Sequence, residues 1–409
     1  MFKKVLSLFI AVLMVAALCV SMSSCGNTAD DDFKLGVILL HDEASTYDLN
    51  FIEAVNRAAE QLGLSEDQVL FKKNIPESND CYEAAADLVD DGCDVIFADS
   101  FGHETFLLKA AKEFTDVQFC HATGTMAHTE KLDNFHNAFA SIYEGRFLAG
   151  VAAGMKLNEM IESGKITADA ARIGYVGAFP FEEVKSGYTA FFLGARSVCP
   201  SVTMDVKFTN SWGDLALEKE AAEALIASGC VLISQHADTT GAPTACEAAG
   251  VPCVGYNISM IPAAPNSALI SAACNWGAYF EFALKNVLAG EAFAPDWCYG
   301  YVDGAVFCTE LNETTAPAGA AEKVAEVEAA LKDGSLKVFD VTTFTVKPSE
   351  GGTYTVDENG HVTSAFALDT DGDFAPDFGE AIVDGAFAES TLRSAPYFGL
   401  DIDGITMVE

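Results

Sequence analysis

The stretch LGVILLHDEASTYDLNF, residues 35–51, passes from an apolar run into a cluster of polar side chains and one tyrosine. Residues 35–40 have the length and composition of a strand that is buried on both faces, as in a parallel sheet. The polar part leads directly into an amphipathic helical pattern over 49–62. In open parallel sheets, ligands bind beyond the carboxyl ends of the strands, in the loops before the helices. The stretch therefore predicts an α/β fold with a ligand site next to its first strand.

The same alternation of strand and helix recurs along the chain. Further strands are expected at 68–72, 95–98, 117–121, 171–176, 203–208, 231–234 and 253–256, and further helices at 81–91 and 216–228. Such alternation predicts parallel sheets that are covered by helices on both faces. Because the pattern restarts near Ala171, we expect two doubly wound units whose strand ends face each other across a cleft.

The first 24 residues have the features of a signal peptide. Lysines near the N-terminus precede an unbroken apolar run over 5–20, and small residues come directly before Cys25. This order is typical of a secretory signal rather than a membrane span, and small residues before a cysteine are similar to a bacterial lipobox. We expect residues 1–24 to be removed, Cys25 to carry a lipid, and residues 25–33 to form a tether. A plain signal peptide with an unrelated cysteine is the alternative.

The composition excludes some classes of protein. The chain has 60 acidic and 23 basic residues and a formal charge of −37 at pH 7. Nucleic-acid binding requires a basic surface, so no nucleic-acid partner is expected. After residue 25 no run approaches the ~20 apolar residues that cross a bilayer.

Catalytic motifs and cysteine-based metal motifs are missing from the sequence. No GxSxG, HExxH, P-loop or dinucleotide fingerprint occurs, so we do not expect an enzyme. The cysteines show no CxxC or Cys/His metal spacing. Several cysteines lie in or beside apolar strand-like runs, which suits small buried hydrophobic residues. Mostly free thiols are therefore expected, and one or two disulfides stay an open alternative.

Aromatic and polar residues gather in or just beyond the loops that follow the predicted strands. The aromatic candidates are Tyr47, Phe101, Trp212, Tyr256 and Trp276. The polar candidates beside them are Ser45, Asp48, Asp238, Asn257 and Asn275. A flat ligand needs ring faces to stack on and a few polar groups to fix its orientation. For each aromatic, packing at the base of a loop is the alternative, and Asp48 is equally placed to cap a helix.

A change of composition after residue 338 predicts a β-rich acidic appendage. Within it, DTDGDFAPDFGE has acidic residues at positions 1, 3, 5, 9 and 12 of a twelve-residue loop: Asp369, Asp371, Asp373, Asp377 and Glu380. That is the acidic spacing of an EF-hand calcium loop, although Phe374 stands where the glycine belongs. A structural calcium site and a solvated acidic turn are both open, and no other cofactor is expected.

Five segments together resemble the basic membrane protein (BMP) family. They are HDEASTYDLNF, FLAGVAAGM, IGYVGAFPFEEVKSGYTAFFLGARSVCP, NSWGDLALEKEAAEALIASG and ISQHADTTG. The family consists of substrate-binding lipoproteins of ABC importers, and some members bind purine nucleosides. The resemblance runs from about residue 33 to 339 and does not cover the tail.

The resemblance implies a type I periplasmic-binding-protein fold, with two Rossmann-like lobes and a hinged cleft. We expect residues 34–140 and 258–340 to form the first lobe and residues 141–257 the second. Residues 341–409 would then be the β-rich extension.

The resemblance also assigns candidate roles in the cleft. The family's first stacking aromatic and the asparagine beside it fall on Tyr47 and Asp48, and its second stacking aromatic falls on Trp212. The position of the family's ribose-binding aspartate corresponds to about Asn257 in this chain. The position of a lysine in the family corresponds to Asn275 or Trp276. Both charged groups are replaced here, which shifts the expected ligand from a nucleoside toward a free nucleobase such as adenine.

We therefore expect a lipid-anchored receptor on the extracytoplasmic face of a bacterial membrane. It would close two lobes around a purine nucleoside or nucleobase and deliver it to the permease subunits of an ABC importer. Two alternatives come from other classes: a surface nucleosidase or hydrolase on a similar α/β frame, and a sensory lipoprotein.

Overall fold

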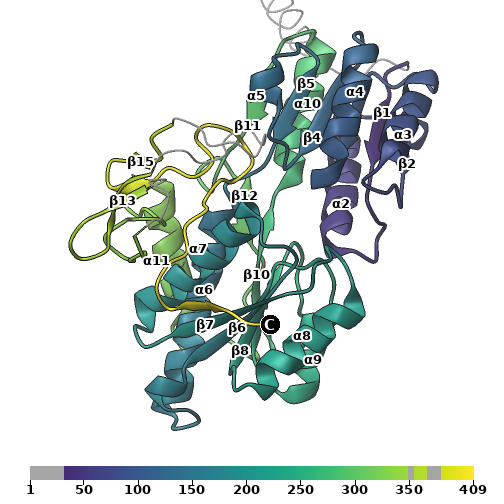
Figure 1. The fold of residues 1–409 in the computed structure, drawn as a ribbon. Coiled ribbons are helices and arrows are strands. Elements are labelled where there is room, and N and C mark those ends of the chain that lie inside the picture. Colours follow the sequence, from purple (N-terminus) through teal and green to yellow (C-terminus); the bar gives the residue numbers. More distant parts are fainter. Residues whose placement is uncertain (1–31, 349–353, 366–378) are drawn as a thin grey trace, which may run out of the picture.

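The computed structural model describes residues 32–348, 354–365 and 379–409. A parallel sheet and a second sheet that is parallel except for the antiparallel strand β12 organise this part of the chain, each with helices on both faces (Figure 1). The predicted signal peptide and Cys25 lie outside the described residues. Of the predicted calcium ligands, Asp369, Asp371, Asp373 and Asp377 also lie outside them.

The first lobe is built on a six-stranded sheet with the order β11-β5-β4-β3-β1-β2, and all its described pairings are parallel. The strands are β1 (Leu35–Ile38), β2 (Val69–Lys72), β3 (Val95–Ala98), β4 (Gln118–Ala122), β5 (Phe135–Ala138) and β11 (Asp296–Trp297). Its helices are α2 (Thr46–Leu62), α3 (Asn79–Asp90), α4 (Glu104–Glu113), α5 (Ala127–Glu130) and α10 (Trp276–Ala289).

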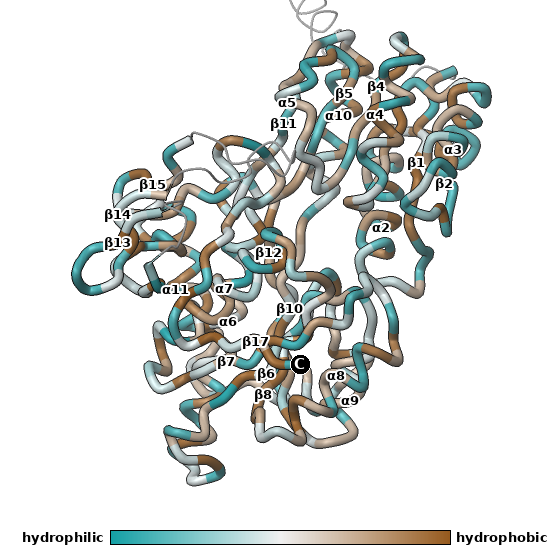
Figure 2. Tube along the Cα trace, viewed as in Figure 1, coloured by the Kyte–Doolittle hydropathy of each residue, from teal (hydrophilic) through white to brown (hydrophobic). Residues whose placement is uncertain are grey.

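The strand β1 shows why both faces of this sheet are covered. Leu35 and Val37 point into the core beneath α2 and α10, whereas Ile38 points into the core beneath α3 and α4. Successive side chains of a strand point to opposite faces, so an apolar residue at every position requires helices on both sides. Figure 2 shows this as hydrophobic colouring along β1 and hydrophilic colouring on the outer helix α3.

The second lobe is built on a seven-stranded sheet with the order β12-β10-β9-β8-β6-β7-β17. The strands are β6 (Arg172–Gly177), β7 (Thr203–Phe208), β8 (Leu232–Gln235), β9 (Cys253–Tyr256), β10 (Ala268–Cys274), β12 (Val306–Cys308) and β17 (Ile405–Met407). The helices are α6 (Ile142–Glu162), α7 (Glu182–Val198), α8 (Leu215–Ala227) and α9 (Gly241–Ala249), and α11 (Ala320–Lys332) packs on α6.

The α/β class and the two doubly wound units are confirmed, but the predicted lobe boundary needs a correction. Residues 258–340 were expected in the first lobe, and α10 and β11 do lie there. The strands β10 and β12 lie instead in the second sheet, because β10 pairs in parallel with β9 and β12 pairs with β10. The chain therefore crosses between the lobes again after β10.

The C-terminal extension is also more integrated than an appendage. It contains two small two-stranded sheets, formed by β13 (Tyr354–Val356) with β14 (Val362–Ala365) and by β15 (Ile382–Val383) with β16 (Ala386–Phe387). Its last strand, β17, extends the second sheet by pairing in parallel with β7. Figure 1 shows this yellow segment passing beside α7 before it reaches the sheet.

The ten cysteines after residue 25 are all free, and most of them are buried. Glu380 accepts hydrogen bonds from the Ser364 hydroxyl and from the amides of Ala365 and Ile382, at 2.6, 3.0 and 2.8 Å. Within the described ranges no group of three or more candidate side chains could hold a metal ion. No helix in these ranges has the length and hydrophobicity of a membrane span.

Candidate ligand-binding site

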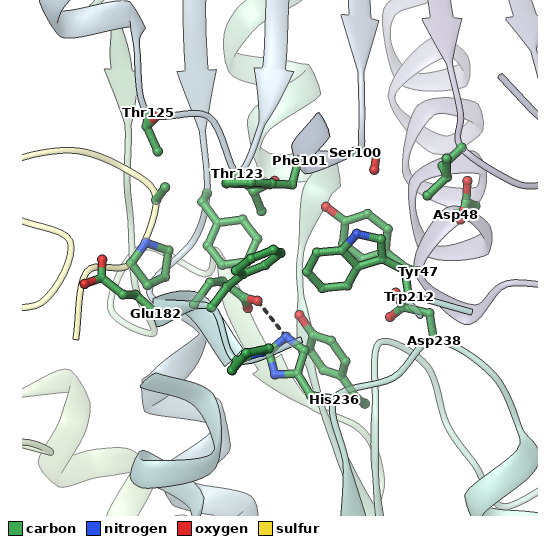
Figure 3. A pocket seen from close by; sticks show the side chains of 18 of the residues that line it. Tyr47, Asp48, Ser100, Phe101, Thr123, Thr125, Glu182, Trp212, His236 and Asp238 are labelled. Atoms are coloured by element: carbon green, nitrogen blue, oxygen red, sulfur yellow. Dashed lines mark ion pairs between the residues drawn. The ribbon is translucent and has the colours of Figure 1, made fainter. Parts of the chain in front are cut away.

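Loops at the carboxyl ends of both sheets enclose a cavity of about 350 Å³ (Figure 3). This volume lies in the range of small-molecule sites. The lining residues are Leu40, His41, Tyr47, Asp48, Ser100, Phe101, Thr123, Thr125, Phe139, Pro180, Phe181, Glu182, Glu183, Trp212, His236, Asp238, Tyr256, Arg393, Ala395 and Pro396. The cavity therefore lies where parallel sheets place their ligands, between the two lobes.

Aromatic rings form much of the wall. Tyr47 and Phe101 come from the first lobe, and Phe181 and Trp212 come from the second. The Tyr47 hydroxyl donates to the carbonyl of Asp99 at 2.9 Å, which fixes the ring at the cavity. Trp212 packs against Phe181, with ring centroids 5.9 Å apart. The ring faces that a flat ligand requires are thus present on both lobes.

The two lobes meet directly beside the cavity. The Phe101 ring stacks on the Phe181 ring across the cleft, with centroids 5.3 Å apart and an angle of 30° between the ring planes. The Thr46 amide of the first lobe donates to the Asp238 carbonyl of the second at 2.7 Å. These contacts describe a closed cleft.

Asp238 is a buried acceptor that faces the cavity from the second lobe. One of its oxygens accepts from the Asn257 side-chain amide at 2.9 Å. Asn257 holds this position in a left-handed backbone conformation, with φ = 67°, directly after β9. Burial, with the carboxyls of Glu218, Asp48 and Glu183 nearby, raises the pKa of Asp238 well above its usual range. Asn257 thus positions an acceptor and does not itself line the cavity.

A chain of hydrogen bonds at the floor of the cavity fixes the orientation of Glu183. The buried Arg146 stacks on the Tyr256 ring at 3.5 Å and donates to the Gln235 carbonyl and to His236 Nδ1, at 2.7 and 3.1 Å. A guanidinium can only donate, so His236 Nδ1 accepts and its proton is on Nε2. His236 Nε2 lies 2.7 Å from Glu183 Oε2, the contact drawn as a dashed line in Figure 3.

This chain leaves one carboxylate oxygen available at the cavity. Glu183 Oε1 is buried and has no hydrogen-bond partner among the described residues. Burial lowers the pKa of His236, which favours the neutral ring with its proton toward Glu183. A ligand that presents an N–H or O–H group would satisfy Glu183 Oε1.

At the first-lobe edge, Asp48 combines two roles. It is buried in the first turn of α2, where it accepts from the His41 amide at 2.8 Å, and it also lines the cavity. Ser45 is the N-cap of this helix and accepts from the Asp48 amide at 3.3 Å, so it supports the cavity without lining it.

The structure does not bring Asn275 and Trp276 into the cavity. Trp276 is 1% exposed and stacks on Phe51 at 4.3 Å within the core of the first lobe. Asn275 is the N-cap residue of α10, and its side chain donates to the Gly304 carbonyl at 2.9 Å. Six of the ten predicted contacts line the cavity, namely Tyr47, Asp48, Phe101, Trp212, Asp238 and Tyr256.

Sequence reasoning missed several residues that the structure places at the cavity. Phe181 and Glu183 were visible only as part of a loop after a strand, where acidic residues also commonly occupy the first turn of the next helix. Arg146, which orients the cavity residues but does not line the cavity itself, lies in the second turn of the long helix α6, and nothing local marks it. Arg393, Ala395 and Pro396 come from the C-terminal extension, which no pattern in the sequence placed near the cleft.

Comparisons with known proteins agree with this geometry. Residues 36–334 match the family model of PnrA-like ABC transporter substrate-binding proteins. A purine-binding protein of Brucella abortus (strain 2308) is 32% identical over 314 residues, which cover 76% of this chain and 84% of that protein. A putative ABC transporter glucose-binding protein of Haloferax volcanii is 36% identical over 198 residues, which cover 48% of this chain and 47% of that protein.

Solved structures support the fold. A solute-binding protein of an ABC transporter system from Aeropyrum pernix K1 superposes with a TM-score of 0.64 at 18% identity and covers 78% of this chain and 95% of its own. One from Conexibacter woesei superposes with a TM-score of 0.60 at 18% identity, covering 75% and 98%. The type I periplasmic-binding-protein architecture is thus confirmed. With two lobes, a closed cleft between them and a family match over most of its length, the chain belongs to the PnrA-like family of ABC transporter substrate-binding proteins.

Proposed function

We propose that this substrate-binding protein captures a purine nucleobase or nucleoside in the cleft between its lobes. The observation that carries the proposal is the combination of aromatic faces with buried acceptors. Tyr47 and Trp212 offer ring faces to a flat ligand, and Asp238 and Glu183 offer carboxyl oxygens. Purines present ring N–H and exocyclic amine donors, and a nucleoside adds the hydroxyls of its ribose. The relative from Brucella abortus, which is named as purine-binding, supports the same ligand class.

We propose further that binding occurs without chemical conversion of the ligand. The neutral His236 is held between Arg146 and Glu183, so its two ring nitrogens are already engaged. A hydrolase would need an acid–base pair converging on the bond to be broken. Inosine incubated with the protein should therefore yield no hypoxanthine.

A substrate-binding component of an ABC importer works on the extracytoplasmic side and delivers its ligand to permease subunits. We propose that Cys25 carries the lipid that anchors this chain to the membrane. The support is the order of basic, apolar and small residues before that cysteine.

A thermal-shift panel followed by calorimetric titration tests the ligand class. We expect adenine, adenosine, guanosine or inosine to raise the Tm, while ribose and glucose do not. The comparison of adenine with adenosine decides whether a sugar is required. A clear shift with glucose and none with any purine would overturn the proposal and favour the ligand named for the Haloferax volcanii relative.

The variant Trp212→Ala sharpens the test by removing one ring face. Stacking of a base on an aromatic side chain contributes about 1–3 kcal/mol, so the Kd for the purine should rise about five- to 150-fold. Tyr299→Ala removes an exposed aromatic outside the cavity lining and is the matched control, for which the Kd should stay unchanged. Equal Kd values for Trp212→Ala and the wild type would exclude Trp212 as a ligand contact.

A further inference from the structure

The C-terminal extension contributes a buried loop to the cleft, residues 388–396, which we call the strap. It follows β16 and includes the cavity residues Arg393, Ala395 and Pro396. Ser394 is 0% exposed and Arg393 is 5% exposed, although the segment forms no helix or strand. The strap lies beyond residues 36–334, which match the family, so the family resemblance does not account for it.

The conformation of the strap is fixed from within. The Tyr397 hydroxyl accepts from the amides of Thr391 and Leu392, at 3.0 and 3.2 Å, and donates to the Ala388 carbonyl. The next residue, Phe398, stacks on Phe339 with ring centroids 4.4 Å apart. One buried hydroxyl therefore ties both ends of the loop together, and the strap behaves as a unit.

The strap is attached to the second lobe at several points. Its Glu389 accepts from the Ser186 hydroxyl, and its Arg393 pairs with Glu182 at 3.3 Å; both partners lie on α7. Beyond the strap, Asp401 pairs with Lys185 at 2.7 Å, and β17 joins the edge of the second sheet. These contacts predict that the strap moves with the second lobe.

The strap also reaches the first lobe. The buried amide of Ser394 donates to Asp296 Oδ1 at 2.7 Å, and Asp296 lies on β11 in the first sheet. The other oxygen of Asp296 lies 3.4 Å from His128 Nδ1 on α5. A loop that is carried by one lobe thus makes a charge-assisted hydrogen bond to the other beside the cavity.

The strap occupies one end of the cavity. In Figure 3 the yellow C-terminal chain passes beside Thr125 and Glu182, whereas Tyr47, Asp48 and Trp212 lie at the opposite side. A ligand stacked on Tyr47 and Trp212 would therefore have the strap at the far end of its site. A two-lobed cleft gains a third wall in this way.

We propose that the strap is the third wall of the ligand site and a latch between the lobes. It closes together with the second lobe, and the Ser394–Asp296 hydrogen bond then holds the cleft shut, so the ligand leaves only after this contact breaks. The latch rests on the proposed function in one respect, namely that the cleft between the lobes binds the ligand.

The test compares variants at Asp296 with a matched control. Asp296→Ala removes the acceptor and should raise the dissociation rate of the ligand about tenfold, because the Ser394 amide loses a charged partner. Asp296→Asn keeps an acceptor oxygen and should restore most of the slow dissociation. Asp401→Ala removes an exposed contact between the extension and the second lobe alone, and should leave the rate unchanged.

Two readouts separate this proposal from the purine assignment. The first is stopped-flow tryptophan fluorescence with adenine and with adenosine, and the second is the radius of gyration of the ligand-free protein by X-ray scattering. If the wild type binds neither compound, the purine assignment fails, and the scattering alone then decides the latch. The latch predicts a larger radius for Asp296→Ala than for the wild type and for Asp401→Ala.

Wild-type dissociation rates and an unchanged radius in a folded Asp296→Ala variant would overturn the latch. Circular dichroism establishes folding. If Asp296→Ala does not fold, the test compares Asp296→Asn, which keeps an acceptor, with Ser394→Pro, which removes the amide donor itself. The latch then requires fast dissociation or a larger radius for Ser394→Pro only.

Discussion

At the scale of single residues, the buried Glu389 makes the stability of the folded protein depend on pH. Its carboxyl is buried in the strap and accepts from the hydroxyls of Ser186 and Ser390. Burial, with the carboxyls of Glu183 and Glu144 nearby, raises its pKa to about 8 from the ordinary value of 4.5. Between these two pH values the folded protein holds a proton that the unfolded chain releases. The free energy of unfolding therefore falls as the pH rises through this window.

The variant Glu389→Gln should remove this dependence, because glutamine is neutral in both states and has a similar size. We expect its Tm to be close to that of the wild type at pH 5 and several degrees higher at pH 8. Calorimetric scans from pH 5 to 8 measure the difference. Exposed Glu291→Gln removes the same charge at the surface and is the control. Parallel Tm curves for wild type and Glu389→Gln would contradict the argument.

Some of the residues at the ligand site could be predicted from the sequence, and others could not. Tyr47 and Trp212 could be predicted because each follows directly on a recognisable strand, and topology carries such residues to the cleft. Trp276 follows β10, which is not among the predicted strands, and it is a core residue, since it stacks on Phe51 inside the first lobe. The role of Glu183 depends on Arg146, which lies in another helix. No local pattern contains a contact of that kind.

At the scale of elements, the crossing of α6 and α7 depends on two glycines. A β-carbon on Gly150 of α6 would overlap the Phe191 carbonyl of α7, and one on Gly194 of α7 would overlap the Phe147 carbonyl of α6. The backbones therefore approach as closely as helices can. This pair forms one face of the second lobe, and α7 also carries the strap contacts.

Gly150→Ala should destabilise the protein even though alanine is the better helix former. Overpacking costs about 1–3 kcal/mol, and here the obstacle is backbone, which cannot rotate away. Urea denaturation measures the loss. Gly277→Ala, in the first turn of α10, meets only the Asn275 side chain at 3.2 Å and is the matched control. A gain in stability for Gly150→Ala would show that the helices can separate without penalty.

Elements with strong apolar runs were predictable, and weak ones were not. The strands β3, β7 and β9 have the predicted bounds. The strand β5 was not predicted because His136 and Asn137 interrupt its apolar pattern, although both side chains are buried and hydrogen-bonded. The strand β10 is apolar at six of its seven positions, but three of these residues are alanine and only one is β-branched, so it lacks the composition typical of a strand. Because β10 was not predicted, the lobe boundary was misplaced.

At the scale of the whole molecule, the charge balance opposes the compact state. The formal charge is −37, with 60 acidic and 23 basic residues, and such an excess destabilises a folded protein through self-repulsion. Exposed ion pairs such as Arg57–Glu53 contribute little stability that could offset this repulsion. Repulsion acts over the whole surface, and its range shrinks from a screening length of about 30 Å at 0.01 M salt to about 3 Å at 1 M.

The Tm should therefore rise as sodium chloride increases from 10 to 500 mM at neutral pH, because screening relieves more repulsion than attraction. Differential scanning calorimetry measures the rise, and a neutral osmolyte at the same osmolality controls for solvent effects. The affinity for a neutral purine should change little over the same range, since binding transfers no charge into the cleft. A Tm that falls with salt would mean that ion pairs across the lobes and the extension outweigh the net charge in holding the closed molecule together.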